Sequence, residues 1–260
     1  NLQNITHHGD AARPYVAEWA QFIRRGFVAA PGMVLVKADI GQEEPRIGAF
    51  LAGDAALLEE LENGDVYCPV AALEFGRPIT RADVVERQIG KRGWMAWLNG
   101  AGPAGIQESA FWLSNGDAAR VVRYLQNRHP RIEAYRAGLV ATLHEQGYTT
   151  THFGRRIYRP EVWAGPGPIR AHAERSVMPD AIQGTAADVM KVWLPRCVER
   201  LPASAHLLLT VHDELVGEAP LELIPEVRRI VTRVMSQPWS ELGGLALPVD
   251  PASSGATTLG

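Results

Sequence analysis

The chain has 260 residues, of which 46% are hydrophobic, and its formal net charge is −3. That length suffices for one large domain or two small ones with a substantial buried core. No stretch reaches the roughly 18 consecutive apolar residues of a membrane span, and the opening NLQNITHHGD lacks the charged and apolar segments of a signal peptide. These features argue against a membrane protein and predict an intracellular, cytoplasmic one.

Cysteine usage agrees with that location. Cys68 and Cys197 are the only two cysteines, they lie far apart, and neither belongs to a CxxC pair. A disulfide framework or a structural zinc site would need more cysteines at closer spacing. We therefore expect two reduced, buried thiols.

Charge is unevenly distributed along the chain. Residues 77–159 contain 13 Lys or Arg and 6 Asp or Glu, a local charge of +7, whereas the remaining residues contain 13 and 23, a local charge of −10. Phosphates attract basic surfaces, so the net charge alone argues against nucleic acid. The asymmetry allows one region to bind phosphate and the other to bind metal cations. A solvated charged surface is the alternative.

The first 60 residues predict a helix, a strand and further helix. Apolar side chains recur at helical spacing in YVAEWAQFIRRGF (15–27), with Ile23 and Phe27 on the apolar face, and Pro31 and Gly32 end this segment. MVLVKADI (33–40) is an apolar strand with Asp39 at its end, and helical periodicity resumes over 44–61.

The middle of the chain is predominantly helical. One helix is predicted from Thr80 to about residue 100 and another from Asp117 to about residue 129, each opening on a residue that caps helices well. Residues 147–160 predict a hairpin that turns at Gly154, and the Pro- and Gly-rich segment 163–174 predicts a loop.

The last third returns to strands. Residues 173–201 are helical, with a fresh segment opening at Gly184, and the apolar runs on either side of VHDE predict a buried hairpin near 207–220. A helix over 220–237 and a short strand over 244–250 follow, and the small polar tail 251–260 is expected to be disordered. Helices mixed with well-separated strands favour an α+β fold.

Three carboxylates stand at predicted strand ends. Asp39 closes the first strand, and Asp213 and Glu214 occupy the turn of the hairpin. If these strands share one sheet, the carboxylates converge into a site that suits Mg²⁺, which prefers hard oxygen ligands. Two such ions can support an in-line phosphoryl displacement. The alternative is that Asp213 and Glu214 only form an exposed turn, where Asp is common.

A row of residues on the helix after Thr80 suits an anion. Arg87, Lys91, Met95 and Asn99 follow one another at intervals of four residues and therefore share one face. Cations one turn apart repel each other, and a triphosphate would relieve that repulsion. The alternative is a solvated basic stripe.

The ordered set of motifs resembles DNA polymerase family A, the DNA polymerase I-like group. ADIGQEEPRIGAFLAGD is similar to its first palm motif, ERQIGKRGWMAWLNG to its fingers helix and VHDE to its second palm motif. Supporting segments are NLQN, IRRGFVAAPG, GYTTTHFGRRIYRPE and AERSVMPDAIQGTAAD, and together they cover about residues 1–250.

The resemblance implies an antiparallel palm sheet flanked by helices, with an inserted, mostly helical fingers subdomain and no thumb or exonuclease domain. The palm would comprise residues 1–56 and 172–260, and the fingers residues 57–171. The implied activity is that of a DNA-directed DNA polymerase that uses two Mg²⁺ ions, primer-template DNA and dNTP. The missing thumb or exonuclease region, or another subunit, would supply further grip on DNA.

The resemblance also assigns roles to individual residues. Asp39 and Asp213 would hold the metals, with Glu214 a supporting catalytic residue. Contacts to the nucleotide would come from Arg87, Lys91, Met95, Gln42 and Glu44, of which Glu44 excludes a ribose 2′-hydroxyl. Contacts to DNA would come from Gln183, Arg175, His212 and Asn99. Alternatively, Gln183 caps a helix and Arg175 is an ordinary surface residue.

The fingers helix departs from the family pattern. Met95 stands where the family has a stacking aromatic residue, and Asn99 stands where it has a tyrosine. Trp94 or Trp97 could supply the ring after a local rotation, but tryptophan at helical spacing is more often a core residue. Two other functions remain open: a catalytically silent nucleic-acid-binding module, or a single-subunit RNA polymerase, which Glu44 disfavours.

Overall fold

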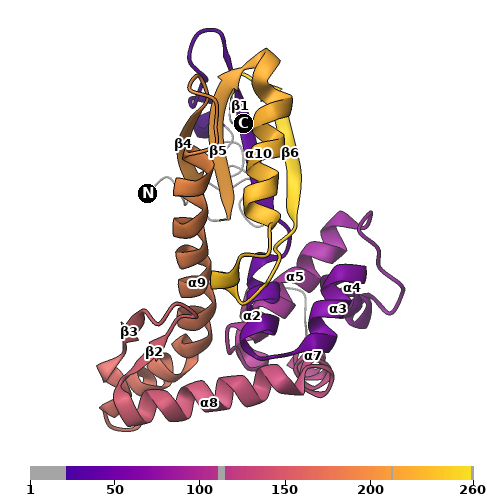
Figure 1. Ribbon diagram of the computed structural model, residues 1–260. Coiled ribbons are helices and arrows are strands. Elements are labelled where there is room, and N and C mark those ends of the chain that lie inside the picture. Colours follow the sequence, from indigo (N-terminus) through magenta and orange to yellow (C-terminus); the bar gives the residue numbers. More distant parts are fainter. Residues whose placement is uncertain (1–21, 111–114, 212, 259–260) are drawn as a thin grey trace. The chain divides into compact units, whose positions relative to one another are not determined.

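The computed structural model describes residues 22–110, 115–211 and 213–258 (Figure 1). The chain divides into two compact units: the sheet unit, residues 1–43 with 189–260, and the helical unit, residues 44–188. The predicted α+β character is confirmed, because helices accompany two small antiparallel sheets. Within the described ranges, no helix has the length and apolar character needed to span a bilayer.

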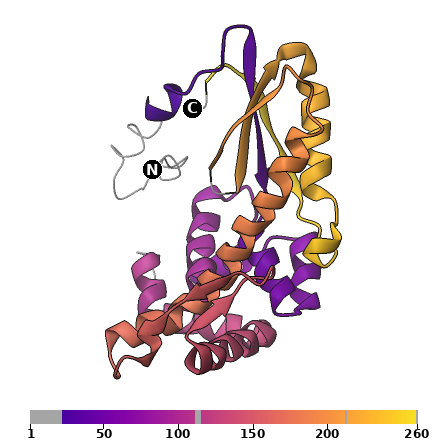
Figure 2. The same cartoon turned by 60° about the vertical axis from the view of Figure 1, so that its left-hand side comes forward.

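The sheet unit is built on four antiparallel strands in the order β4-β5-β1-β6. These strands are β1 (Met33–Ile40), β4 (His206–Val211), β5 (Glu214–Pro220) and β6 (Val249–Ala256). The predicted hairpin is therefore present as β4 and β5, and β1 lies against β5 with Ala38 opposite Leu215. In Figure 2 the indigo strand β1 runs between the orange strand β5 and the yellow strand β6.

Alternation along β1 gives the sheet two distinct faces. Val36, Ala38 and Ile40 join the main core with α10 (Ile224–Ser236), whose apolar side is buried against the sheet (Figure 1). Leu35 points to the opposite face, where it packs with Val211 and Val216. Odd-numbered residues of β1, including Asp39, thus lie on the face away from α10. The short 3-10 helices Leu221–Leu223 and Ser240–Leu242 flank α10 in sequence.

The helical unit holds eight helices and one small hairpin among its described residues. The helices are α2 (Glu43–Leu51), α3 (Ala55–Asn63), α4 (Tyr67–Phe75), α5 (Val84–Leu98), α6 (Pro103–Ser109), α7 (Asn115–Arg128), α8 (Pro130–Gln146) and α9 (Pro168–Val198), whose last residues belong to the sheet unit. Strands β2 (Tyr148–Thr150) and β3 (Arg156–Tyr158) form the predicted hairpin, and a 3-10 helix covers Pro160–Trp163.

Helices α4 and α5 approach each other closely at Gly90. A Cβ atom on Gly90 would lie 2.2 Å from the carbonyl oxygen of Tyr67 and 2.9 Å from the amide nitrogen of Ala71. Only glycine permits backbone contact at that distance. The absence of a side chain at this position therefore fixes how α4 lies along α5.

Three local predictions were wrong. The tail predicted to be disordered from residue 251 forms most of β6, because the free edge of β1 offers backbone hydrogen bonds that do not depend on apolar side chains. The loop predicted over 163–174 becomes helix from Pro168, a residue well suited to a first helical turn. The fresh helical segment predicted at Gly184 does not exist, since α9 runs through it.

The ends of two other helices differ from prediction. Helix α5 begins at Val84, because Thr80 is bonded through its amide and hydroxyl to the carboxylate of Asp83 and lies before the helix. Of the helix predicted over 15–27, residues 15–21 lie outside the described residues. Ile23 is 50% exposed, contrary to its predicted place on the apolar face, and Arg24 is 2% exposed. Phe27 packs against the cluster of Leu35, Val211 and Val216, as predicted for an apolar face. The helical turn ends by residue 25, so the periodicity assumed through Phe27 does not hold.

The close approach at Gly90 generates a stability prediction. Gly90→Ala should destabilise the protein by about 1–3 kcal/mol, because the added methyl group forces α4 and α5 apart. Gly138→Ala is the matched control: Gly138 is an exposed position in α8 with open space around its Cβ, and the change should stabilise by about 0.5–1 kcal/mol. Chemical denaturation measures both, and equal effects of the two changes would contradict the packing account.

Candidate active site

Three carboxylates belong to the end of the sheet where β1 ends and β5 begins. The pairing of β1 with β5 extends to Ala38 and Leu215, and the next residues outward at that end are Asp39 on β1 and Glu214 on β5. Neighbouring strands are about 4.8 Å apart. Asp213 precedes Glu214 at the β4–β5 turn, and its negative charge acts on the Glu214 carboxyl. The register thus puts Asp39 at the same end of the sheet as Asp213 and Glu214, although Asp39 is far from them in sequence.

Two cations accompany these carboxylates, the buried Arg24 and the partly exposed Lys37. Glu214 is 8% exposed, and its Oε1 lies 3.7 Å from Nη2 of Arg24, which is itself 2% exposed. Burial raises the pKa of Glu214, while the positive charges of Lys37 and Arg24 oppose that rise. Burial likewise lowers the pKa of Lys37 and of Arg24. The cations therefore offset the cost of burying the Glu214 carboxylate beside Asp213.

The turn after β1 carries a strained residue. Gln42 has a φ of 55°, the only positive φ among the described non-glycine residues. A left-handed conformation costs an ordinary side chain roughly 1–2 kcal/mol. Such strain is concentrated at functional sites, and here it lies between Asp39 at the end of β1 and the first turn of α2, where Pro45 is tolerated.

The carboxylate end of the sheet fits Mg²⁺ better than a closed metal site. Asp39 and Asp213 are both partly exposed and offer only oxygen donors. Within the described ranges, no three His, Cys, Asp or Glu residues are grouped as a metal centre. Mg²⁺ does not need one, since it usually takes one or two carboxylates and completes its shell with water and substrate phosphate.

In the helical unit, α5 presents the predicted cationic face over the ring of Tyr67. The guanidinium carbon of Arg87 lies 5.1 Å from the ring centroid, and Nζ of Lys91 lies 5.9 Å from it. The Tyr67 hydroxyl contacts Sδ of Met95 at 3.9 Å. Arg87 also donates from Nε to Oδ2 of Asp65 at 2.8 Å. Three of the four predicted residues on this face therefore share one aromatic neighbour.

The tryptophans of α5 are core residues. Trp94 is 0% exposed and Trp97 is 1% exposed, and they pack edge to face with centroids 5.6 Å apart. Because both rings are buried, neither is available to stack on a ligand in place of the aromatic residue that the family has at the position of Met95. Asn99 is the C-cap residue of α5 and is partly exposed. Its backbone amide donates to the carbonyl of Met95, four residues earlier.

Two residues predicted for separate roles, Glu44 on α2 and Gln183 on α9, contact each other. Nε2 of Gln183 donates to Oε1 of Glu44 at 3.4 Å, and Ile182 packs against Gly48 beside them. Arg175 is exposed, and its backbone passes Gly100 just beyond the end of α5. His212 lies outside the described residues.

Sequence reasoning missed four residues of these sites: Arg24, Lys37, Asp65 and Tyr67. Asp65 had a detectable signal, because an aspartate before an apolar helical run predicts an N-terminal cap. Lys37 is on the same strand face as Asp39 by simple alternation. Burial of Arg24 had no signal, since its neighbours Arg25 and Ile23 suit a solvated and an apolar face respectively.

Comparisons with known proteins agree on one family. The family model described as DNA polymerase family A matches residues 1–253. The chain is 35% identical to the thermostable DNA polymerase I of Thermus thermophilus over 92% of its own length and 28% of that protein. It is 34% identical to DNA polymerase I of Pseudomonas aeruginosa over 91% of its length and 25% of that protein.

A solved structure has the same fold. The POL domain of Pol1 from M. smegmatis, in complex with DNA primer-template and dNTP, superimposes with a TM-score of 0.80 and 28% sequence identity. The similarity covers 100% of this chain and 44% of that one. The chain thus spans between a quarter and a half of the proteins it matches.

The buried cation beside Glu214 generates a prediction. Arg24→Met should destabilise the protein by about 3 kcal/mol, because it leaves the buried carboxylate short of one compensating charge. Arg25→Met is the control: Arg25 is exposed, and its replacement should change stability by about 0.5 kcal/mol or less. A denaturant titration that found the two variants equally stable would show that Arg24 does not support Glu214.

Proposed function

Because the chain belongs to DNA polymerase family A, we propose that it carries the catalytic part of a DNA-directed DNA polymerase. Such an enzyme adds deoxynucleotides to a primer 3′ end under the direction of a template and releases pyrophosphate. The observation that supports the proposal is the pairing of β1 with β5, in which the end of β1 that carries Asp39 lies at the end of the sheet where β5 begins with Glu214. The chain spans 28% of the length of the Thermus thermophilus relative.

Asp39 and Asp213 would hold two Mg²⁺ ions, for which their oxygen donors and partial exposure are suited. When bound, Mg²⁺ lowers the pKa of an attacking hydroxyl and stabilises charge on a leaving phosphate. Asp39 and Asp213 would thereby orient the primer 3′-hydroxyl and the nucleotide phosphates. Glu214, anchored by Arg24 and Lys37, would keep the turn that carries Asp213 in place.

Arg87 and Lys91 would bind the triphosphate. They stand on one face of α5, and both lie over the ring of Tyr67, the first residue of α4. A guanidinium donates several hydrogen bonds to phosphate oxygens, and an ammonium adds a point charge. Met95 and Gln42 would contact the nucleotide, with the thioether of Met95 packing against the base in place of a ring.

Glu44 would choose between sugars, and the residues on α9 would contact DNA. The Glu44 carboxylate, which accepts a hydrogen bond from Gln183, would occupy the space that a 2′-hydroxyl needs. Gln183 would read acceptors that all base pairs share in the minor groove, and therefore pair geometry rather than sequence. Arg175, Asn99 and His212 would contact primer or template.

In the terms of the family, the palm would comprise residues 1–56 and 172–260, and the fingers residues 57–171. Arg87, Lys91 and Met95 would then lie on the fingers, and the metal-binding carboxylates on the palm. Closure of the fingers over the nucleotide is a gating step of the kind that excludes water and commits the substrate.

Loss of one metal-binding carboxylate provides the first test. Asp213→Asn should lower the rate of primer extension by at least about a thousandfold, because one anionic ligand disappears while the side chain keeps its size. Thermal unfolding should be unchanged, since Asp213 is partly exposed at a turn. Extension by this variant at the wild-type rate would contradict the assignment, and DNA binding without extension by the wild type would support a silent binding module.

Sugar selection provides the second test. Glu44→Ala should allow ribonucleotides to be incorporated at least about tenfold more efficiently relative to deoxynucleotides, because the space for a 2′-hydroxyl opens. The measurement is kcat/KM for rNTP and dNTP on one primer-template. A wild-type enzyme that prefers rNTP would favour an RNA polymerase, and an unchanged ratio in the variant would remove Glu44 from sugar selection.

A further inference from the structure

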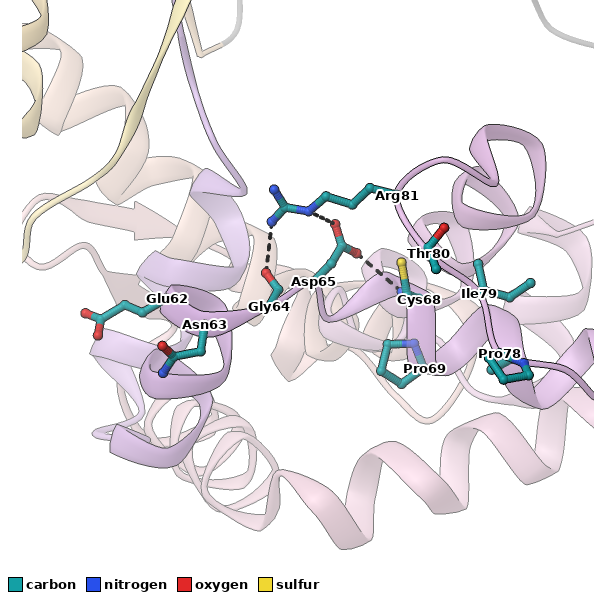
Figure 3. Close-up of a pocket in the computed structure, with 11 residues that line it drawn as sticks. Glu62, Asn63, Gly64, Asp65, Cys68, Pro69, Pro78, Ile79, Thr80 and Arg81 are labelled. Atoms are coloured by element: carbon teal, nitrogen blue, oxygen red, sulfur yellow. Dashed lines mark hydrogen bonds and ion pairs between the residues drawn. The ribbon is translucent and has the colours of Figure 1, made fainter.

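Asp65 is a buried carboxylate just before α4, and its two oxygens accept hydrogen bonds from different partners. Oδ1 accepts hydrogen bonds from the amides of Tyr67 at 3.0 Å and Cys68 at 3.3 Å, which caps the helix. Oδ2 accepts from Nε of Arg87 at 2.8 Å and lies 2.7 Å from its Nη2. The side chain is 6% exposed. Figure 3 shows it directed toward the amide of Cys68 and toward Arg81.

The carboxylate is charged in spite of its burial. Burial alone would raise the pKa of Asp65, but the hydrogen bond and charge of Arg87, with the amides of Tyr67 and Cys68, outweigh it and lower the pKa. Arg81 adds a weaker contact, with its Nε 3.4 Å from Oδ2 and its side chain 69% exposed. Asp65 is therefore a fixed anion whose nearest strong partner is the cation proposed to bind triphosphate.

The geometry of the pair leaves the far side of the guanidinium for a ligand. Arginine has five N–H donors in a planar fork. Asp65 takes the edge formed by Nε and Nη2, and across the described ranges Nη1 donates no hydrogen bond. The side chain of Arg87 is 23% exposed, so part of it reaches solvent.

Backbone packing sets where α4 and α5 meet. The contact between α4 and α5 at Gly90 sets the start of α4 against the first half of α5. Tyr67, two residues after Asp65, then lies beneath Arg87 and Lys91 and touches Met95. The guanidinium of Arg87 is thus held at its edge by a carboxylate and on its face by a ring.

We propose that Asp65 is a positioning residue that fixes the guanidinium of Arg87 for triphosphate binding. This inference rests on the proposed function of Arg87. A free arginine loses side-chain entropy when it binds an anion, and prior fixation removes that cost. Asp65 also repels phosphate, but Arg87 and Arg81 neutralise its charge at close range. Fixation is therefore the larger effect, and loss of Asp65 weakens nucleotide binding.

The test measures primer extension by the full chain, with KM for dNTP separated from kcat. Asp65→Asn keeps the size of the side chain and one oxygen for the amides of α4, but it removes the charge that holds Arg87. KM should rise about tenfold, with kcat changed by about twofold or less. The same substitution in an Arg87→Ala background should change KM by about twofold or less, because its effect acts through Arg87.

Asp83→Asn is the matched control. Asp83 is also an aspartate near the start of α5, but its carboxylate is bonded to Arg77 at 2.9 Å and to Thr80. Its replacement should leave KM for dNTP unchanged. Thermal unfolding of each variant identifies any loss of fold. Should Asp65→Asn fail to fold, Arg87→Lys serves instead, because it keeps the charge but loses the two-nitrogen contact, and it should raise KM similarly.

Specific outcomes overturn the inference. An unchanged or lower KM in Asp65→Asn would show that Asp65 does not assist Arg87 or that it competes with the triphosphate. An equal rise in KM with and without Arg87 would assign Asp65 a purely structural role. If Asp65→Asn is unfolded, an unchanged KM for dNTP in Arg87→Lys overturns the inference. A wild-type chain that neither extends primers nor binds dNTP would instead overturn the proposed function itself.

Discussion

The antiparallel pairing of β1 with β5 is the constraint on which the candidate active site depends. Side chains alternate along a strand, so a slip of one residue would turn the odd-numbered side chains of β1 toward α10. Val36, Ala38 and Ile40 are buried against that helix and hold the register in which Ala38 faces Leu215. The apolar core on one face thereby determines that Asp39 and Glu214 belong to the other face, at the same end of the sheet.

The helical unit uses a similar device with different parts. Gly90 permits α4 and α5 to touch through their backbones, and this contact sets the position of Asp65 and Tyr67. Those two residues hold the side chains of Arg87, Lys91 and Met95 on one face of α5. In both units, a charged group of the proposed site has neighbours of opposite charge: Arg24 and Lys37 act on Glu214. In the helical unit, Asp65 binds Arg87, whose guanidinium also lies over the ring of Tyr67.

The sequence predicted which helices and strands form better than it predicted where they begin and end, or which buried residues hold the site. Apolar runs sufficed to predict β1 and the β4–β5 hairpin, since buried strands need such runs, and four-residue spacing sufficed to place Arg87 and Lys91 on one face. The strand β6 was not predictable from its small polar residues, because its pairing depends on the backbone edge that β1 leaves available. The burial of Arg24 was equally hidden, because it depends on Glu214, about 190 residues further along the chain.

Anomalous X-ray scattering from Mn²⁺ tests the central claim most directly. Crystals of the chain with primer-template, dNTP and a primer that lacks its 3′-hydroxyl would hold the nucleotide without reaction, and Mn²⁺ accepts the oxygen ligands that suit Mg²⁺. The account predicts anomalous peaks at coordination distance, roughly 2.0–2.3 Å, from carboxylate oxygens of both Asp39 and Asp213. Peaks that contact neither aspartate, or an ordered nucleotide whose ions contact only one of them, would contradict it.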